Sequence, residues 1–216
     1  MAEIGIMGGT FDPVHNGHLL LGKQAYLEYR LDQIWFMPSG IPPHKKDHVV
    51  TAVEDRLNMV SLAVEPYPYF LCSDFESKRQ GNTYTAETLR LLRTKYPAHR
   101  FYFIIGADSL YQIENWYHPE KVMEQAVLLV ANREYEQAFC PITEQISYLE
   151  QQYGADIRLL HCKEVDISSG ELREMARQGK ELHQYIPKCV EEYILSHKIY
   201  GNPCDLLIKG EEHAKC

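Results

Sequence analysis

Six short apolar runs are spaced along the chain, and each is followed by a stretch with helical periodicity. The runs lie at residues 3–7, 33–37, 69–73, 101–105, 126–131 and 156–161. The helical stretches lie at residues 17–30, 53–65, 84–95, 119–125, 142–153, 169–178 and 187–197. Apolar runs that do not alternate with polar residues are typical of strands buried on both faces. The pattern therefore predicts an α/β fold, a doubly wound parallel sheet with helices on both faces.

The length of 216 residues suits one domain with a full core. We expect a single domain over residues 1–200 and a loose tail over residues 201–216, which are polar and contain glycine. Sheets of this kind bind ligands at the carboxyl ends of their strands. The residues of chemical interest cluster there, at 8–18, 38–46, 106–108, 132–133 and 167–173.

Composition narrows the class of protein. No apolar run approaches the roughly 20 residues that span a bilayer, and no basic segment precedes an apolar one at the N-terminus. The six scattered cysteines form no CxxC pair, which predicts free thiols in a reducing cytoplasm and argues against a zinc knuckle. The net charge of −8 argues against non-specific nucleic-acid binding. We expect a cytoplasmic protein with neither a membrane nor a nucleic-acid partner.

The stretch GGTFDPVHNGHL at residues 8–19 joins the first apolar run to a helical pattern. A strand, a glycine-rich turn and a helix start present backbone N–H groups to a phosphate. If the helix begins near His15 or Asn16, the rings of His15 and His18 lie on one face, beside the partial positive charge of the helix N-terminus. A turn with two surface histidines is the plain alternative. A metal site lacks a third ligand at nearby spacing, so we predict no metal ligands.

Residues 167–179, ISSGELREMARQG, open a later helix. Ser168 or Ser169 can cap it, and Glu171 has capping-box spacing from Ser168. A well-capped helix alone would explain these residues. Beside the first motif, the hydroxyls and Arg173 also suit a second phosphate clamp.

Three further stretches bear on a second substrate. The proline-rich loop 38–47 carries His44 and Lys45, which suit either a solvated basic turn or phosphate contact. In TYTAETL, Thr85 is expected to cap a helix. Trp116 and Tyr117 suit either helix packing or a stacking platform for a planar ring.

GGTFDPVHNGHL resembles the HxGH signature of Rossmann-like nucleotidyltransferases, which transfer a nucleoside monophosphate and release pyrophosphate. ISSGELR resembles the second motif of that superfamily, with Gly170 in place of the usual Thr and Leu172 in place of Ile. The resemblance implies a Rossmann-like fold and catalytic roles for His15, His18 and Arg173. It implies ATP binding by Gly8, Gly9, Thr10, Phe11, His15, Gly17, His18, Ser168, Ser169 and Arg173.

From about residue 3 to residue 200, the chain resembles the bacterial nicotinate mononucleotide adenylyltransferases. The likeness rests on both motifs, the PPHK loop, TYTAETL, and GADSL followed by Trp116. It implies AMP transfer from ATP to nicotinate mononucleotide, with Mg²⁺ carried on the ATP phosphates. It implies mononucleotide binding by His44, Lys45, Thr85, Asp108, Trp116, Tyr117 and Arg133. The stretch ANREYEQ at 131–137 departs from the family's Arg-Pro-Gly turn but keeps Arg133.

Two other kinds of function are compatible with parts of this pattern. Pantetheine-phosphate adenylyltransferases and cytidylyltransferases share the signature. Their activities do not account for the TYT and Trp-Tyr stretches, and pantetheine-phosphate adenylyltransferases are typically shorter than this chain. A non-catalytic nucleotide-binding regulator would need fewer aligned donors than His15, His18 and Arg173 provide. The sequence does not indicate an oligomeric state.

Overall fold

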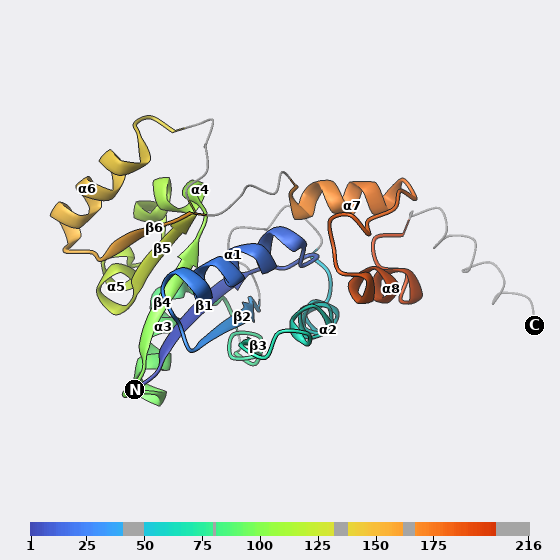
Figure 1. Ribbon diagram of the computed structural model, residues 1–216, viewed down its shortest axis with the longest axis horizontal. Helices are drawn as coiled ribbons and strands as arrows, with labels where there is room; N and C mark the ends of the chain where they lie inside the picture. Colours follow the sequence, from blue (N-terminus) through green and yellow to red (C-terminus); the bar gives the residue numbers. More distant parts are fainter. Residues whose placement is uncertain (41–49, 80, 132–137, 162–166, 202–216) are drawn as a thin grey trace, which may run out of the picture.

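The computed structural model describes residues 1–40, 50–79, 81–131, 138–161 and 167–201. Within these residues, six strands form one all-parallel sheet in the order β3-β2-β1-β4-β5-β6. The strands are β1 (Glu3–Gly9), β2 (Gln33–Pro38), β3 (Phe70–Cys72), β4 (Arg100–Ile105), β5 (Val127–Ala131) and β6 (Ile157–Leu160). The predicted fold class is confirmed (Figure 1).

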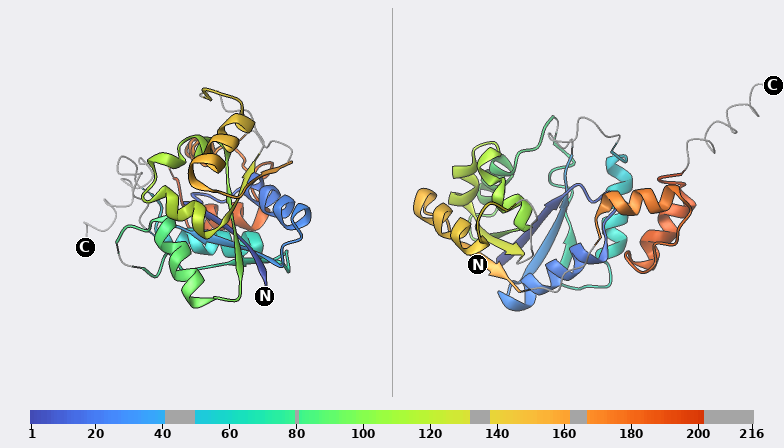
Figure 2. Two further views of the ribbon diagram at one scale, coloured as in Figure 1. Left: turned by 90° about the vertical axis from the view of Figure 1, so that its left-hand side faces the viewer. Right: turned by 90° about the horizontal axis from the view of Figure 1, so that it is seen from above.

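Helices connect the strands and cover the sheet (Figure 2). They are α1 (Asn16–Glu28), α2 (Val53–Val64), α3 (Thr85–Lys95), α4 (Ala107–Tyr111), the 3₁₀ turn η1 (Ile113–Asn115), α5 (Pro119–Gln125), α6 (Ile142–Tyr153), α7 (Ser169–Arg177) and α8 (Lys188–Ser196). The last two lie at one end of the sheet, beyond the start of α1, and α8 packs beside α2.

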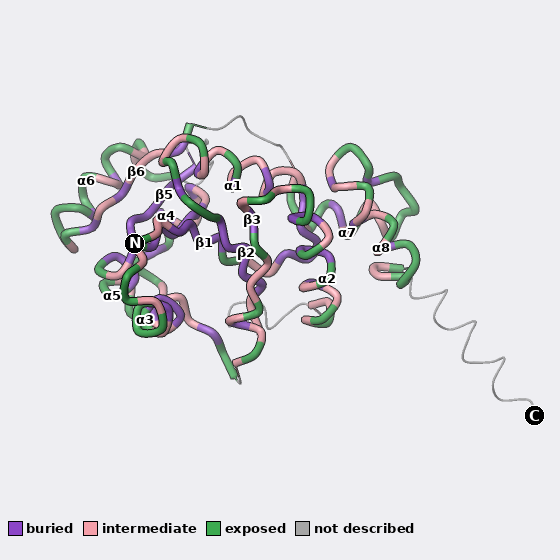
Figure 3. Tube along the Cα trace, turned by 60° about the horizontal axis from the view of Figure 1, so that its bottom comes forward, coloured by how far each residue is buried: buried purple, intermediate pink, exposed green. Residues whose placement is uncertain are grey.

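Successive side chains of the central strands enter two separate cores. Met7, Ile34 and Phe36 pack with α1, α2, α7 and α8. On the other face, Ile6 and Trp35 pack with α3, α4, α5 and α6. The buried residues of the central strands therefore pack on helices on one side or the other, as expected for a sheet buried on both faces. Figure 3 shows this burial concentrated along the strands, with the outer surfaces of the helices exposed.

The predicted elements correspond to the observed ones with small differences at their ends. β1 runs to Gly9 rather than to residue 7, because Gly8 and Gly9 pair with Met37 and Pro38 of β2. The turn expected to begin at Gly8 therefore begins at Thr10. The short α4 and η1 were not predicted, because five and three residues are too few to show a helical period.

The strand order reverses between β1 and β4, which lie side by side at the centre of the sheet. Connections leave these two strands toward opposite faces, and sheets of this kind bind ligands at the carboxyl ends of the strands at such a point. The segments that follow β1 and β4 lie at these ends, and they carry His15, His18 and Asp108.

Three other sequence predictions can be compared only with the described part of the chain. Cys72, Cys140 and Cys189 are free thiols. None of the helices in the described part of the chain is long and apolar enough to cross a membrane. Of the predicted tail, all but Gly201 lies outside the described residues.

Candidate active site

The turn after β1 begins with a strained residue. Phe11 has a φ of +50°, a left-handed conformation that is uncommon for a bulky side chain and costs about 1–3 kcal/mol. Its ring is 2% exposed and packs into the core, which offsets that cost. A Cβ on Gly9 would lie 3.2 Å from the Phe11 ring, so a larger residue there would push the ring away. Gly9 and Phe11 thus fix where the chain leaves the sheet.

The two histidines of the first motif lie together at the start of α1. His15 is the N-cap, and its backbone N–H donates to Nδ1 of His18 over 3.2 Å. The ring centroids are 3.8 Å apart, and the edge of His18 meets the Phe11 ring at 5.0 Å. An accepting Nδ1 carries no proton, so the His18 ring proton is on Nε2. The prediction that both rings share one face is confirmed.

Helix α7 brings the second motif to the same turn. Ser169 Oγ donates to the Pro13 carbonyl over 2.9 Å, and Arg173 donates to the Asp12 carbonyl over 2.7 Å. These contacts join residues 156 and 161 positions apart in the sequence. The two sequence motifs, predicted to lie together, are therefore in direct contact.

The start of α7 is capped as the sequence predicts. Ser168 Oγ accepts from the Glu171 N–H over 3.2 Å, and the Glu171 carboxylate accepts from the Ser168 N–H over 2.7 Å. The Ser168 hydroxyl also donates to the Glu171 carboxylate over 2.6 Å, and this bond, followed by the bond from the Ser168 N–H, lowers the pKa of Glu171. A Cβ on Gly170 would lie 3.7 Å from Ser168 Oγ, an ordinary contact, so space does not exclude the threonine usual there.

The electrostatics of this turn favour an anion. α1 begins directly after the turn and α7 packs on it, so two helix N-termini approach it, each with a partial positive charge of about half a unit. The Arg173 guanidinium and the two imidazoles add donors. Together these groups can hold several phosphate oxygens, the geometry that helix N-termini provide for nucleotides.

A buried arginine that the sequence reasoning missed organises the surrounding loops. Arg56 is 2% exposed and donates to four backbone carbonyls, those of Thr10, Ser39, Gly40 and Thr51, over 2.8 to 3.1 Å. Burial lowers the pKa of Arg56, and the Asp12 carboxylate opposes that shift. Arg56 precedes the buried Met59 and Val60 by three and four residues, and this position on the apolar face of α2 is the signal that could have revealed it.

Substituting Arg56→Lys should lower the free energy of unfolding by about 2 kcal/mol. The single ammonium of lysine cannot reach all four carbonyls that the planar guanidinium of Arg56 contacts. Urea denaturation followed by circular dichroism measures the change. Arg90→Lys is the matched control, since Arg90 lies on the exposed surface of α3 and pairs with Glu87. Equal midpoints for the two variants would show that the Arg56 hydrogen bonds do not stabilise the loops.

Thr85 is not the N-cap of α3, which corrects the sequence prediction. The N–H of Thr88 donates to the carbonyl of Tyr84, so Tyr84 is the N-cap and Thr85 is the first helical residue. Tyr84 makes no side-chain capping bond. The backbone N–H of Thr85 consequently belongs to the first helical turn, whose N–H groups have no partner within a helix.

The aromatic residues after η1 lie beside β4 and beside the start of α3. Trp116 meets the Phe103 ring edge-on at 6.2 Å, and that ring lies 3.4 Å from the position of a Cβ on Gly8. Tyr117 is 53% exposed and its ring lies 4.4 Å from that of Tyr84. The TYT and Trp-Tyr stretches are therefore neighbours. Asp108 lies in the first turn of α4, directly after β4.

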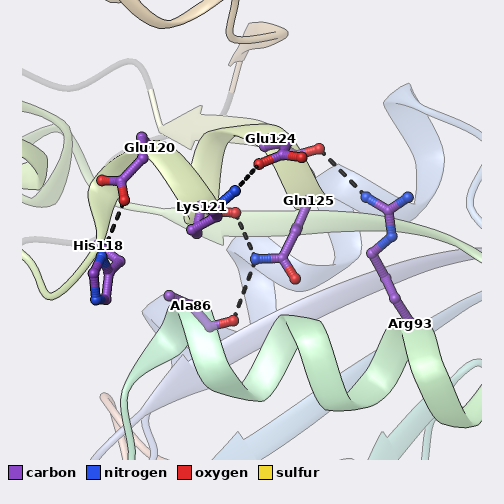
Figure 4. A network of polar contacts seen from close by, with 7 residues as sticks. All are labelled: Ala86, Arg93, His118, Glu120, Lys121, Glu124 and Gln125. Atoms are coloured by element: carbon purple, nitrogen blue, oxygen red, sulfur yellow. Dashed lines mark hydrogen bonds and ion pairs between the residues drawn. The ribbon is translucent and has the colours of Figure 1, made fainter.

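Polar contacts between α3 and α5 fix this arrangement (Figure 4). Gln125 donates to the Ala86 carbonyl over 3.3 Å, and Arg93 donates to the Glu124 carbonyl over 3.4 Å. His118, which precedes α5, has a φ of +51° and contacts Glu120 over 3.0 Å. Thr85 is the first residue of α3, and Tyr117 lies just before α5. The bonds of Gln125 and Arg93 between these helices therefore help to fix the distance between Thr85 and Tyr117.

Some predicted site residues cannot be placed. His44, Lys45 and Arg133 lie outside the described residues. Among the residues that the structure describes, no group of three or more histidine, cysteine, aspartate or glutamate side chains could hold a metal ion.

The chain matches the cytidylyltransferase-like family over residues 6–175. It is 42% identical to a probable nicotinate-nucleotide adenylyltransferase of Lachnoclostridium phytofermentans, over 93% of this chain and 100% of the relative. It is 35% identical to a probable nicotinate-nucleotide adenylyltransferase of Oceanobacillus iheyensis, over 93% and 98% of the two chains. The chain therefore belongs to the nicotinate-nucleotide adenylyltransferase family.

Solved structures share the fold. The nicotinic acid mononucleotide adenylyltransferase of Plasmodium falciparum complexed with NaAD superposes with a TM-score of 0.74 at 22% identity, covering 93% of this chain and 98% of the other. The same protein complexed with APC gives a TM-score of 0.73 at 21% identity, with the same coverage.

Proposed function

We propose that this enzyme transfers AMP from ATP to nicotinate mononucleotide, giving nicotinate adenine dinucleotide and pyrophosphate in NAD biosynthesis. The observation that carries the proposal is the meeting of both motifs at one turn, where Ser169 and Arg173 of α7 bond to the backbone that leads into His15. The family to which the chain belongs supports the choice of substrates.

In this mechanism the 5′-phosphate of nicotinate mononucleotide attacks the α-phosphorus of ATP in line and expels pyrophosphate. The attacking group is already an oxyanion, so no general base is needed. Catalysis consists of positioning and charge stabilisation. We assign His18 to the α-phosphate, with Nε2–H as its donor, and His15 and Arg173 to the β- and γ-phosphates. The Gly8–Phe11 backbone, Gly17, Ser168 and Ser169 border the same nucleotide.

On the acceptor side, we assign Thr85 and Tyr117 to the nicotinate carboxylate, Trp116 to the pyridine ring and Asp108 to a ribose. His44, Lys45 and Arg133 are assigned to the mononucleotide, with Lys45 able to serve the phosphate of either substrate. Mg²⁺ bound to the ATP phosphates would neutralise their charge, and we assign it no ligands from the described residues.

The decisive experiment measures pyrophosphate release from ATP and from CTP with a panel of acceptors. The panel holds nicotinate mononucleotide, nicotinamide mononucleotide and phosphopantetheine. Turnover with ATP and nicotinate mononucleotide is expected. Preference for phosphopantetheine or for CTP would assign the chain to another activity of the superfamily, and nucleotide binding without turnover with any acceptor would indicate a regulator.

Arg173→Lys should raise KM for ATP about tenfold with little change in KM for nicotinate mononucleotide. Lysine keeps the charge, but it cannot bond to the Asp12 carbonyl and grip two phosphate oxygens as a planar fork can. Initial-rate kinetics with each substrate varied in turn give both constants. Arg177→Lys, one turn further along α7 and exposed, is the control. Equal losses of affinity for both substrates would show that Arg173 serves a different phosphate.

A further inference from the structure

We propose that Tyr200 is a positioning residue for adenylyl transfer, acting through Asp12 on the turn that carries His15 and His18. This inference rests on the proposed function. It adds a residue from beyond α8, 188 positions along the chain from Asp12, to a site otherwise built by the two sequence motifs.

The Asp12 side chain is the point of contact. It is 3% exposed; Tyr200 donates its hydroxyl to Oδ1 over 2.5 Å, and the Thr51 N–H donates to Oδ2 over 3.3 Å. The carbonyl of the same residue accepts from Arg173. Asp12 is therefore bonded from three directions, by the start of α2, by α7 and by the segment after α8.

Tyr200 is a donor under all ordinary conditions. Burial, and then the negative charge of Asp12, raise the pKa of Tyr200 well above its usual value. The phenol keeps its proton, and Asp12 is the acceptor. A bond from a neutral donor to a buried carboxylate is stronger than one between neutral groups.

The backbone at Tyr200 supports a specific role. Its φ is +64°, a left-handed conformation that costs a bulky residue of this kind free energy. Such a conformation persists where the surroundings fix it, and here the ring packs against the core shared by α1, α2, α7 and α8. The chain thus adopts a strained conformation at the residue that reaches Asp12.

The effect on catalysis follows from the position of Asp12. It lies between Phe11, whose ring contacts His18, and His15, the N-cap of α1. If the hydrogen bond from Tyr200 to Oδ1 of Asp12 is lost, the turn can shift and move the imidazoles of His15 and His18 with it. A displacement of about 1 Å costs up to 10²-fold in rate when donors must match a transition state. The loss should therefore be in kcat rather than in KM for the acceptor.

A second tyrosine provides a matched control. Tyr193 of α8 bonds through its hydroxyl to Asp55 and Asn58 of α2, over 2.9 Å in each case. Tyr193→Phe therefore removes hydrogen bonds between the C-terminal segment and α2 without touching the Asp12 turn. A purely structural role for Tyr200 would make the two substitutions equivalent.

The experiment compares Tyr200→Phe and Tyr193→Phe in the full-length enzyme, with both substrates and by thermal denaturation. We expect Tyr200→Phe to lower kcat about tenfold, to leave KM for nicotinate mononucleotide within twofold, and to shift the melting temperature no more than Tyr193→Phe does. Equal kcat values for the two variants would overturn the proposal. So would a Tyr200→Phe chain that fails to fold, because Tyr200 would then serve stability.

Nuclear magnetic resonance supplies a readout that does not depend on turnover. The imidazole signals of His18, assigned by their loss in His18→Ala, should move in Tyr200→Phe and stay in place in Tyr193→Phe. Unmoved His18 signals would contradict the proposal even if the enzyme had another substrate. An inactive wild-type enzyme whose His18 signals respond as expected would contradict the proposed function alone.

Discussion

Replacing His18 with alanine is expected to lower kcat by about 10²-fold or more and to leave the protein folded. The size is that expected for the loss of one donor that acts in the transition state. His18 sits in the first turn of α1, and its Nδ1 accepts from the His15 backbone, so the ring is held in one orientation with Nε2–H as donor. A water molecule entering the space left by the ring would lack that fixed direction.

The substitution also removes the contact with the His15 N–H, which should cost about 1 kcal/mol of stability. Steady-state kinetics at a temperature where the variant is fully folded separates the two effects. His161→Ala is the control, because that histidine is exposed and contacts Glu28, at the opposite end of α1 from His18. A folded His18→Ala enzyme with kcat within a few-fold of wild type would refute the assignment.

The second large effect is selectivity for the acid over the amide, expected to be about 10² to 10⁴ in kcat/KM. Nicotinate offers two acceptor oxygens, whereas nicotinamide replaces one of them with an NH₂ donor. The proposed pocket is built from donors: the hydroxyl and backbone N–H of Thr85 and the backbone N–H of Tyr117. Each pocket donor that faces the NH₂ group of nicotinamide instead of an oxygen costs about 1–3 kcal/mol. Two such mismatches give a selectivity of about 10² to 10⁴.

The structure sharpens this prediction. Because Thr85 is the first residue of α3 rather than its cap, its N–H belongs to the turn in which backbone donors need outside partners. A hydroxyl can rotate to accept, so Thr85→Ala should lower efficiency with both substrates and leave most of the selectivity. Thr94→Ala, on the exposed part of the same helix, is the control.

The measurement is kcat/KM for nicotinate mononucleotide and for nicotinamide mononucleotide at saturating ATP. A ratio near one would show that the backbone donors do not contact the carboxylate. The enzyme would then accept both mononucleotides.

The sequence was informative where function depends on local spacing. The three-residue interval between His15 and His18 predicts that their rings meet at a helix start, and the Ser168–Glu171 interval predicts the capping box of α7. Both are correct because they depend on backbone geometry within a few residues. The order of the strands also follows the common pattern for alternating strands and helices.

The sequence was uninformative where the contact is long-range. Nothing near Arg56 indicates that its partners are backbone carbonyls of two separate connections, because carbonyls occur at every residue. The bond from Tyr200 to Asp12 leaves no local pattern either. The assignment of Thr85 as a cap was wrong by one residue, since helix ends depend on which carbonyl accepts the first bond and not on residue type alone.

The contacts of Asp12 also bear on how the protein is made. The ribosome adds about 5–20 residues per second, so the first motif emerges roughly 10 to 40 s before Tyr200, which lies 188 residues later. During that interval the turn has its histidines but neither the Arg173 nor the Tyr200 bond. We therefore expect that a nascent chain is not competent for turnover until translation has passed residue 200. Premature termination anywhere before residue 200 would yield a product that has the recognisable signature and little of the activity.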